Sequence, residues 1–411
     1  MPTSTRSALT IHCCASLLCF LMLIAAAAAT PFCETDVSLF ANDQCHYRLP
    51  SLLITEKGTV LAAAQKRFGK GDDFAPSSLV LRRSLDGGKT FEPEQVLFGR
   101  EGTITFNGNL VEDRETGTIF ATFIAFPEAE RGSWFQKKWV PQGGGFSIVK
   151  STDGGKTWSE PIEIMPEPNA EGWHGGGAFN NNHGVQLRAG AHAGRLVIGA
   201  RAFKEGVYEG RAKGALIYSD DRGATWKVGG VMLKEIDGIN GEVTVGETGD
   251  GEVYVNSRNG ASKVIIRAKA AGEKAELPPG ITPHRRIYSR SKDGGESFYE
   301  EGVHEELFDG PCNAGLTWVP GEGGGLLFTA PAVQNRSRLT GYLSRDGGRK
   351  WTAGEVISEK SGGYSDSAVL PDQTILTLYE NAKNTERPLG LLLARYNLEW
   401  LMAKPAPAEA K

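Results

Sequence analysis

The segment Ser151-Thr-Asp-Gly-Gly-Lys-Thr-Trp158 recurs in variant form four more times along the 411-residue chain. The other copies are Ser84-Leu-Asp-Gly-Gly-Lys-Thr-Phe91, Ser219-Asp-Asp-Arg-Gly-Ala-Thr-Trp226, Ser291-Lys-Asp-Gly-Gly-Glu-Ser-Phe298 and Ser344-Arg-Asp-Gly-Gly-Arg-Lys-Trp351. Subtracting successive first positions gives spacings of 67, 68, 72 and 53 residues. Each copy follows a short apolar run rich in β-forming residues, as at 214–218. The pattern predicts a recurring turn at the end of a strand.

The residue types within this motif suit a turn better than a reaction. The aspartate can accept hydrogen bonds from amides of its own turn, and glycine adopts backbone angles that other residues resist. The final aromatic residue supplies a large apolar surface that can pack beneath the turn. We therefore interpret all five copies as structural.

Regular turns every 50 to 70 residues, with room for about four short strands between them, indicate radial repetition of small antiparallel sheets. About 380 residues follow position 29, and a mean spacing near 65 residues divides them into roughly six units. The predicted fold is all-β: a six-bladed β-propeller of four-stranded antiparallel blades over residues 30–402. One blade must lack a recognisable copy of the motif.

The two ends of the chain differ from this middle part. Residues 1–29 carry one positive charge, Arg6, no acidic residue, and an apolar run that ends at Ala29. These features are typical of a secretory signal peptide, and the run is too short for a spanning helix of roughly 20 residues. We expect a secreted or periplasmic protein with no stable membrane insertion after cleavage. Residues 403–411, with two prolines, are expected to form a disordered tail.

Composition narrows the expected partners. The net charge is -4 and no block of like charge occurs, so nucleic acid is not an expected partner. Three cysteines follow residue 29, which is too few for a disulfide framework, although Cys33 and Cys45 could pair. Cys312 would then be a buried, unreactive thiol. No cysteine or histidine spacing indicates a zinc site, and we expect neither a metal nor an organic cofactor.

The repeated motif S-x-D-x-G-x-T-W is the Asp box, and the chain resembles the sialidase (neuraminidase) superfamily, in particular exo-α-sialidases of the bacterial and animal type. The resemblance runs from about Tyr47 to Leu401 and includes residues 182–187, Asn-His-Gly-Val-Gln-Leu. Asp boxes also occur in propellers with other functions, so the box argues for the fold alone. The activity must be argued from the site residues.

The resemblance implies that three arginines bind the carboxylate of a sialic acid, because guanidinium groups are planar, permanently charged donors. Arg48 lies in Tyr-Arg-Leu-Pro at 47–50, which matches the first arginine of the family. Arg258 ends Asn-Ser-Arg at 256–258 and matches the second. Arg336 matches the third, expected in a strand eight residues before Ser344. Arg338 is an alternative, because residues i and i+2 of a strand share a face.

The family's nucleophile is a tyrosine in a Y-S-D segment, which matches Tyr364 within Gly-Tyr-Ser-Asp at 363–366. A carboxylate nucleophile would be repelled by the carboxylate on the reacting carbon, whereas a neutral phenol can approach it. The phenol needs a base, and Glu242, 16 residues before Arg258, matches the family's glutamate. Glu247 is the competing choice. We expect the arginines to lower the pKa of the phenol.

The family's general acid lies in a polar loop that follows the first arginine, and the matching loop is at 66–74. Asp73 fits best, with Asp72 as the alternative, and Arg67 in the same segment is a candidate substrate-binding residue. Glu380 matches a buried glutamate that holds the first arginine in place. Asn107 is a further candidate substrate-binding residue, because it occupies a region where many bacterial sialidases place an aspartate that touches the sugar ring.

These matches imply an exo-α-sialidase that removes terminal sialic acid from glycans, glycoproteins or glycolipids with retention, through a tyrosyl-sialoside. A transferase or intramolecular transferase is the alternative among enzymes, and Trp134, Trp139 and Trp173 are candidate aromatic residues for its acceptor site. A non-catalytic Asp-box propeller that binds glycans or proteins is the alternative of a different class.

Overall fold

The computed structural model describes Met1 and residues 30–69, 72–99, 101–130, 146–176, 182–204, 212–234, 242–277, 279–310, 312–381 and 389–403. The predicted signal peptide, apart from Met1, and the tail from 404 onward lie outside these ranges. Within them, none of the helices has the length and apolar character needed to cross a bilayer.

The described strands form six sheets, as predicted. The first contains β2 (Cys45–Ile54), β3 (Val60–Phe68), β4 (Ser77–Ser84) and β5 (Gln95–Phe98). The second contains β6 (Thr103–Asp113), β7 (Thr118–Pro127), β8 (Phe146–Ser151), β9 (Ile162–Ile164) and the short parallel strand β11 (Asn182–His183). The third contains β10 (Trp173–Gly176), β12 (Val185–Gln186), β13 (Leu196–Lys204), β14 (Lys213–Ser219) and β15 (Lys227–Val231).

The other three sheets have four strands each. The fourth contains β16 (Val243–Glu247), β17 (Val253–Ser257), β18 (Arg285–Ser291) and β19 (Glu300–Phe308). The fifth contains β20 (Gly315–Val319), β21 (Gly325–Pro331), β22 (Leu339–Ser344) and β23 (Thr352–Ser358). The sixth contains β24 (Ser365–Val369), β25 (Ile375–Glu380), β26 (Leu391–Tyr396) and β1 (Cys33–Phe40). The described residues also form three short helical elements: η1 (Glu128–Glu130), α2 (Ala261–Ala270) and α3 (Leu398–Leu401).

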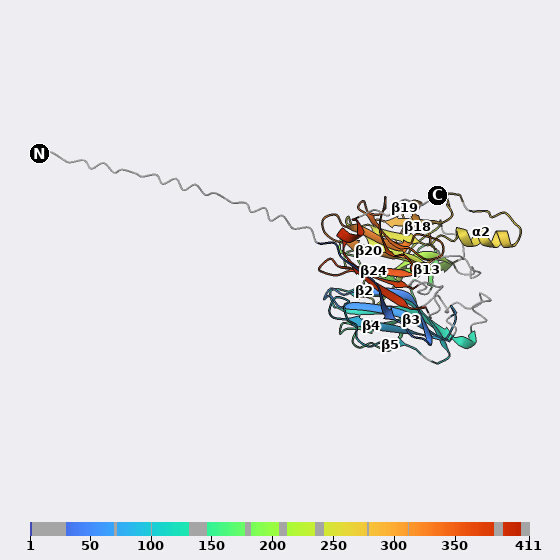
Figure 1. Cartoon of the computed structure of the whole chain (residues 1–411), viewed down its shortest axis with the longest axis horizontal. Coiled ribbons are helices and arrows are strands. Elements are labelled where there is room, and N and C mark those ends of the chain that lie inside the picture. The colour runs from blue at the N-terminus through green and yellow to red at the C-terminus, as the bar shows by residue number, and fades with distance from the viewer. Residues whose placement is uncertain are drawn as a thin grey trace.

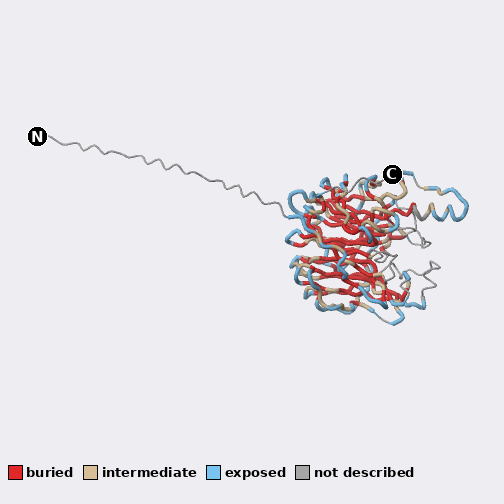
Figure 2. Tube along the Cα trace, in the orientation of Figure 1, coloured by how far each residue is buried: buried red, intermediate tan, exposed pale blue. Residues whose placement is uncertain are grey.

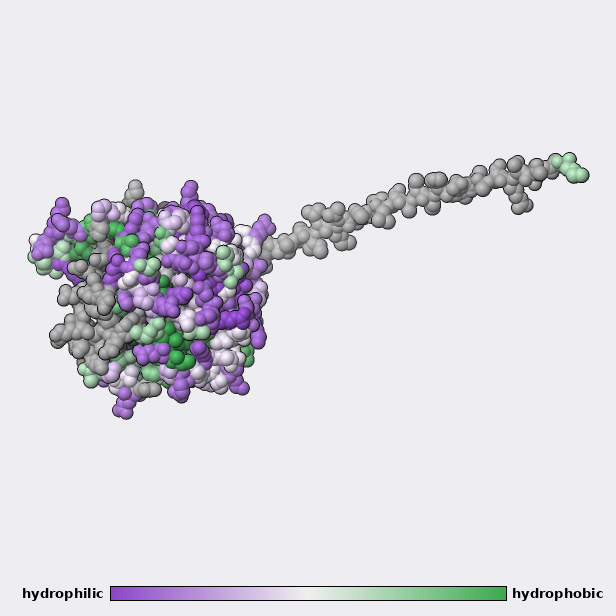
Figure 3. Space-filling view, turned by 180° about the vertical axis from the view of Figure 1, so that it is seen from behind, coloured by the Kyte–Doolittle hydropathy of each residue, from purple (hydrophilic) through white to green (hydrophobic). Residues whose placement is uncertain are grey.

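The sheets are arranged as the six blades of a propeller (Figure 1). Contacts run from β24 to β2, from β2 to β6, from β6 to β13, from β13 to β16, from β16 to β20 and from β20 back to β24, so they close a ring. Buried residues fill the blades and the spaces between them (Figure 2). Most of the surface seen in Figure 3 is hydrophilic. The all-β propeller predicted from the repeats is therefore confirmed, with a fifth, two-residue strand in two of the blades.

Each Asp box connects the third and fourth strands of a blade. In the first box, Ser84 Oγ donates to Asp86 Oδ1 at 2.8 Å, and the amides of Gly88 and Thr90 donate to Ser84 Oγ and Asp86 Oδ1 at 2.9 Å each. The other four boxes repeat the serine-to-aspartate bond and the bond to the serine from the amide of the glycine four residues later. These bonds satisfy the polar groups of a tight turn.

The box aromatics pack between blades and not only beneath their own turn. Trp226 of the third blade meets Phe120 of the second edge-on, with ring centroids 6.3 Å apart. Trp351 of the fifth blade lies 5.9 Å from Tyr254 of the fourth. The boxes therefore stabilise the contacts between neighbouring blades as well as the turns.

The sixth blade lacks an Asp box because of how the ring closes. Its fourth strand, β1, comes from the N-terminal part of the chain and pairs antiparallel with β26. No chain segment connects these two strands directly, so the position that the box occupies in the other blades does not exist. This explains why five motifs accompany six blades.

The expected pairing of Cys33 with Cys45 is wrong. Both are free, as is Cys312, which is buried as predicted. The N-terminal strand is held instead by its backbone pairing with β26 and by polar contacts, including an ion pair at 2.8 Å between Glu34 and Arg395.

We predict that Gly348→Ala destabilises the protein by about 2–4 kcal/mol. Gly348 has a φ of +86°, and an added Cβ would lie 2.7 to 3.2 Å from ring atoms of Tyr254 in the neighbouring blade, so left-handed strain and overpacking combine. Gly117→Ala is the matched control, because Gly117 has a φ of +72° but its Cβ would meet nothing within 4 Å. It should cost only about 1 kcal/mol. The free energy of unfolding in urea measures both, and equal losses would contradict the packing role.

Candidate active site

A hydrogen bond between two blades lies at the centre of the candidate site. The hydroxyl of Tyr364, just before β24, donates to Oε1 of Glu242, just before β16, at 2.7 Å. Burial and Glu242 raise the pKa of Tyr364 well above its ordinary value, although Arg258, Arg336 and Arg48 oppose the rise. The expectation that the arginines lower this pKa is therefore only partly right. The balance of these effects keeps the phenol protonated.

The spacing of 16 residues between Glu242 and Arg258 has a structural cause. Strands β16 and β17 form an antiparallel hairpin in which Val243 is opposite Ser257. Glu242, which precedes Val243, therefore lies opposite Arg258, which follows Ser257. Arg258 Nη1 donates to both carboxylate oxygens of Glu242 at 3.1 Å. Burial opposes the charge of Arg258, but Glu242 outweighs it and raises the arginine's pKa. Glu242 thus contacts both Arg258 and Tyr364.

Arg48 and Tyr364 are held by the same buried carboxylate. Glu380 accepts from Nε of Arg48, from the amide of Leu49 at 3.2 Å and from the amide of Tyr364 at 3.3 Å. Burial alone would raise the pKa of Glu380, but Arg48 and Arg336 outweigh it and lower the pKa. The guanidinium carbon of Arg48 lies 5.6 Å from the centroid of the Tyr364 ring.

The backbone around Arg48 is irregular. Leu49 has a φ of 56°, in the left-handed region, and the pairing of β2 with β3 shifts register between Arg48 and Ser51. Such a bulge redirects the adjacent side chain, and its strain of about 1–3 kcal/mol persists only where surrounding contacts maintain it. The contacts from Glu380 to Arg48 and Leu49 provide that restraint.

Arg336, and not its alternative Arg338, lies beside Tyr364. The guanidinium carbon of Arg336 lies 5.3 Å from the centroid of the Tyr364 ring. Arg338 is 41% exposed and lies 3.7 Å from Glu359. The expectation that Arg336 sits in a strand is wrong, because it occupies a bend before β22 with a φ of 60°. The bend, not strand parity, determines where its side chain goes.

The two neighbouring aspartates of the 66–74 segment have different contacts. Asp73 is 70% exposed, and its Oδ1 lies 2.8 Å from Nη1 of Arg67 and 3.7 Å from Nη1 of Arg48. Asp72 accepts from the amide of Phe74 at 2.8 Å and so stabilises its own turn. Phe74 packs edge-on against Phe106 at 5.5 Å, which fixes this turn to the core. Asp73 is therefore the one directed toward the arginines.

Other expected residues do not join this group. Glu247 ends β16 and accepts from the amides of Arg188 and Ala189, toward the opposite face of the propeller. Asn107 lies in β6, but its side chain is outside what the structure describes. Trp173 is buried, with 7% of its surface exposed, which removes it as an acceptor-site residue. Trp134 and Trp139 lie outside the described residues.

Three contributors to the site were not identified from the sequence: Asp309, Arg286 and Gly363. Asp309 is buried against Arg286 at 3.0 Å and accepts from the amide of Asn259. Its pKa rises to about 6 because burial outweighs the attraction of Arg286 and Arg258. Gly363 is required for space, since an added Cβ would collide with Glu380. An Asp-Gly pair such as 309–310 carries only a turn signal, so only the fold reveals its position.

The charged side chains of the candidate site favour binding of an anion. The guanidinium groups of Arg48, Arg67, Arg258, Arg286 and Arg336 face the carboxylates of Asp73, Glu242, Asp309 and Glu380, which is one more positive charge than negative charges. The described residues contain no group of three or more histidine, cysteine or carboxylate side chains placed to hold a metal ion. The arrangement suits a monoanion that lies beside a buried phenol.

Comparison with known proteins agrees with this description. The model of the BNR repeat-like domain family matches residues 58–377. A sialidase of Micromonospora viridifaciens is 31% identical over 88% of this chain, and the chain spans 53% of that relative's length. Among solved structures, the Hadza microbial sialidase Hz136 has a TM-score of 0.67 at 21% identity, over 87% of this chain and 66% of its own. The intramolecular trans-sialidase of Ruminococcus gnavus has a TM-score of 0.62 at 17% identity, over 89% of this chain and 99% of its own.

The family match covers most of the propeller, and the solved structures share its fold at low sequence identity. The chain therefore belongs to the BNR-repeat proteins of the sialidase superfamily.

Proposed function

We propose that the protein is an exo-α-sialidase that hydrolyses terminal sialic acid from glycans, glycoproteins or glycolipids with retention of configuration. The observation that carries the proposal is the 2.7 Å hydrogen bond from Tyr364 to Glu242, placed beside the guanidinium groups of Arg48 and Arg336. The sialidase from Micromonospora supports the same substrate class. We also propose that residues 1–29 direct export and that residues 30–402 form the catalytic propeller.

Substrate binding begins with the carboxylate of the sialic acid. Arg48, Arg258 and Arg336 would donate to it, and Glu380 and Glu242 limit how far the first two guanidiniums can rotate. Asp73 already lies 3.7 Å from Arg48. A substrate carboxylate would compete with Asp73 for this guanidinium and so direct the acid toward the departing oxygen.

In the first chemical step the hydroxyl oxygen of Tyr364 forms a bond to the anomeric carbon, and its proton passes to Glu242. Asp73 enters this step protonated, because it binds a proton from solvent once the substrate carboxylate has replaced it beside Arg48. The bond from the anomeric carbon to the aglycone oxygen breaks, and the proton of Asp73 passes to the leaving oxygen. In the second step Asp73 takes a proton from water, water oxygen attacks the same carbon, and the phenolate recovers its proton from Glu242. Two displacements at one carbon give net retention.

A neutral, protonated tyrosine can act as the nucleophile without being repelled by the carboxylate of the substrate. A carboxylate here would meet the substrate carboxylate as a like charge at short range. The buried phenol remains neutral while the substrate binds, and it loses its proton only as the new bond forms. The arginines, which oppose the rise in the pKa of Tyr364, would then stabilise the developing phenolate.

We expect Tyr364→Phe to lower kcat for a fluorogenic α-sialoside by about 1,000-fold or more, because it removes the attacking oxygen. Tyr396→Phe is the matched control: this buried tyrosine belongs to the same sheet, but its hydroxyl contacts Thr377 at 2.8 Å. The control should lose about 1 kcal/mol of stability and keep its kcat within about two-fold. Undiminished turnover by the first variant would remove Tyr364 as the nucleophile. Binding of a sialoside without turnover by the unmodified protein would indicate a non-catalytic propeller.

We expect Asp73→Asn to separate substrates by their leaving groups. A sialyllactose needs protonation of a poor leaving group, so its kcat/KM should fall about 100-fold or more. A 4-nitrophenyl sialoside needs little protonation and should lose much less. Asp72→Asn is the matched control and should leave the ratio of the two substrates unchanged, because Asp72 contacts its own turn. An equal loss on both substrates in Asp73→Asn would contradict the role of general acid.

We expect a proton NMR time course to show α-sialic acid as the first product, followed by slow conversion to the β-anomer. Retention follows from the two displacements at the anomeric carbon. First appearance of the β-anomer would exclude a tyrosyl intermediate. An anhydro sugar, formed when the substrate's own hydroxyl replaces water, would assign the protein to the intramolecular transferases.

A further inference from the structure

A cavity of about 650 Å³ lies on the face of the propeller opposite Tyr364. Tyr364 precedes β24, whereas residues 368–371, at the far end of that strand, line the cavity. Glu242 likewise precedes β16, whereas Gly246 and Glu247 at its far end line the cavity. At about 3.3 Å per residue, roughly 13–16 Å separate the two places. The volume is typical of small-ligand sites, which range from about 300 to 1,000 Å³.

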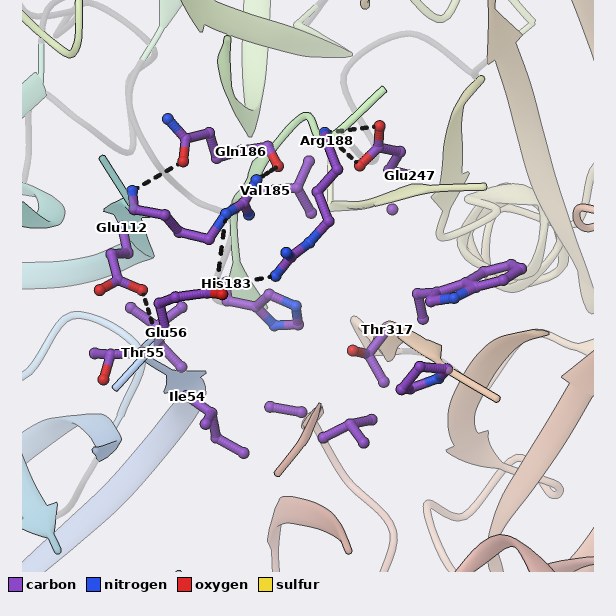
Figure 4. A pocket seen from close by; sticks show the side chains of 18 of the residues that line it. Ile54, Thr55, Glu56, Glu112, His183, Val185, Gln186, Arg188, Glu247 and Thr317 are labelled. Atoms are coloured by element: carbon purple, nitrogen blue, oxygen red, sulfur yellow. Dashed lines mark hydrogen bonds and ion pairs between the residues drawn. The ribbon is translucent and has the colours of Figure 1, made fainter. Parts of the chain in front are cut away.

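The walls of this cavity differ in polarity. On one side, Glu56 and Arg188 form an ion pair at 3.2 Å, with Glu247 beside them (Figure 4). The fifth and sixth blades contribute Trp318, which is 38% exposed, together with Pro320 and the segment 369–371. A ligand that fits must therefore present one apolar face and one hydrogen-bonding face.

A buried imidazole points into the cavity between these walls. The His183 ring lies between Glu56 and Thr317 in Figure 4, and its side chain is 10% exposed. Its Nδ1 contacts Asp366 Oδ1 at 3.0 Å, and among the described residues no hydrogen-bond partner is recorded for Nε2. Burial alone would lower the pKa of His183, but Asp366 outweighs it and raises the pKa. The free nitrogen needs a partner from a ligand or from water.

The chemistry of Nε2 narrows the class of ligand. It donates when the ring is charged and accepts when the ring is neutral, because Nδ1 keeps its proton toward Asp366 in both states. A hydroxyl group serves either state, since it both donates and accepts. A carboxylate on the ligand could bond only to the charged ring. The cavity is also lined by three carboxylates, those of Glu56, Glu112 and Glu247, and by only two guanidiniums, those of Arg114 and Arg188, so a negative ligand would be repelled.

We propose that this cavity binds a neutral carbohydrate. A sugar ring would place its C–H face on the indole of Trp318 and direct its hydroxyls to His183 Nε2 and to the Glu56–Arg188 pair. The end of the indole packs closely against Gly249, because a Cβ added there would lie 2.8 Å from its ring. A fixed aromatic surface loses little conformational freedom when a ligand binds. The protein thus carries a second glycan-binding site, on the face away from its catalytic group.

The experiment titrates the full chain with neutral methyl glycosides of galactose, glucose and N-acetylglucosamine, followed by saturation-transfer NMR and calorimetry. Each titration is run both without and with an unsaturated sialic acid analogue, at a concentration that saturates the proposed catalytic site. At least one glycoside should bind with a dissociation constant on the order of 1 mM. Trp318→Ala should weaken this binding at least ten-fold, and Arg188→Ala, whose side chain is 64% exposed, should weaken it as well.

Phe32→Ala is the matched control, because Phe32 is 37% exposed and its hydrogen bonds to Asn397 use only its backbone. It should leave binding unchanged, and Trp318→Ala should turn over a fluorogenic sialoside at the normal rate. The proposal is overturned by absence of binding, by undiminished binding in both cavity variants, by displacement with the sialic acid analogue, or by tighter binding of methyl glucuronide than of the neutral sugars. Because the readout is equilibrium binding, it does not depend on whether the chain cleaves sialosides.

Discussion

The carboxylate of Asp366 connects three parts of the ring near its axis. It is fully buried and accepts from the amide of Leu52 in β2 and from the amide and ring of His183 in β11, at 2.8 to 3.0 Å, as well as from Asn182 at 3.2 Å. A buried carboxylate without such donors would cost several kcal/mol, so its position is fixed by the need for them. Tyr364 precedes Asp366 by two residues, and the location of its hydroxyl therefore depends on this connection.

The same geometry brings the other site residues together. Both Glu242 with Arg258 and Tyr364 with Glu380 are cross-strand neighbours at the open end of a hairpin formed by the first two strands of a blade. The innermost strands approach one another at the axis, so residues just before them converge from separate blades. Each arginine that contacts Tyr364 thereby acquires a carboxylate nearby, and the side chains are fixed before any substrate arrives. Rigidity here comes from strand register and charge pairing together.

The fold could be predicted from the sequence, because the Asp boxes mark turns at regular spacing. The 16-residue interval between Glu242 and Arg258 was matched only through the family resemblance, and the structure shows that it reflects a hairpin register. The missing sixth box follows from ring closure between β26 and β1, which no local motif encodes. The left-handed φ of Leu49 and the bend at Arg336 depend on contacts from distant residues such as Glu380. The strand that the family resemblance implied for Arg336 was therefore wrong. The contact between Asp366 and His183 could not be predicted either, because the two residues are 183 positions apart and meet only in the folded chain.

The pairing of β1 with β26 also has a consequence for the order of assembly during synthesis. Of the described strands, the ribosome makes β1 first and β26 last. The sheet that these two strands complete is the one whose innermost strand, β24, follows Tyr364. Nascent chains that contain the first five blades still lack this sheet, and β1 must wait with unpaired backbone groups until its partner emerges. Tyr364 therefore reaches its contacts with Glu242 and Arg48 only when the last sheet is complete, so the candidate site is the last part of the ring to form.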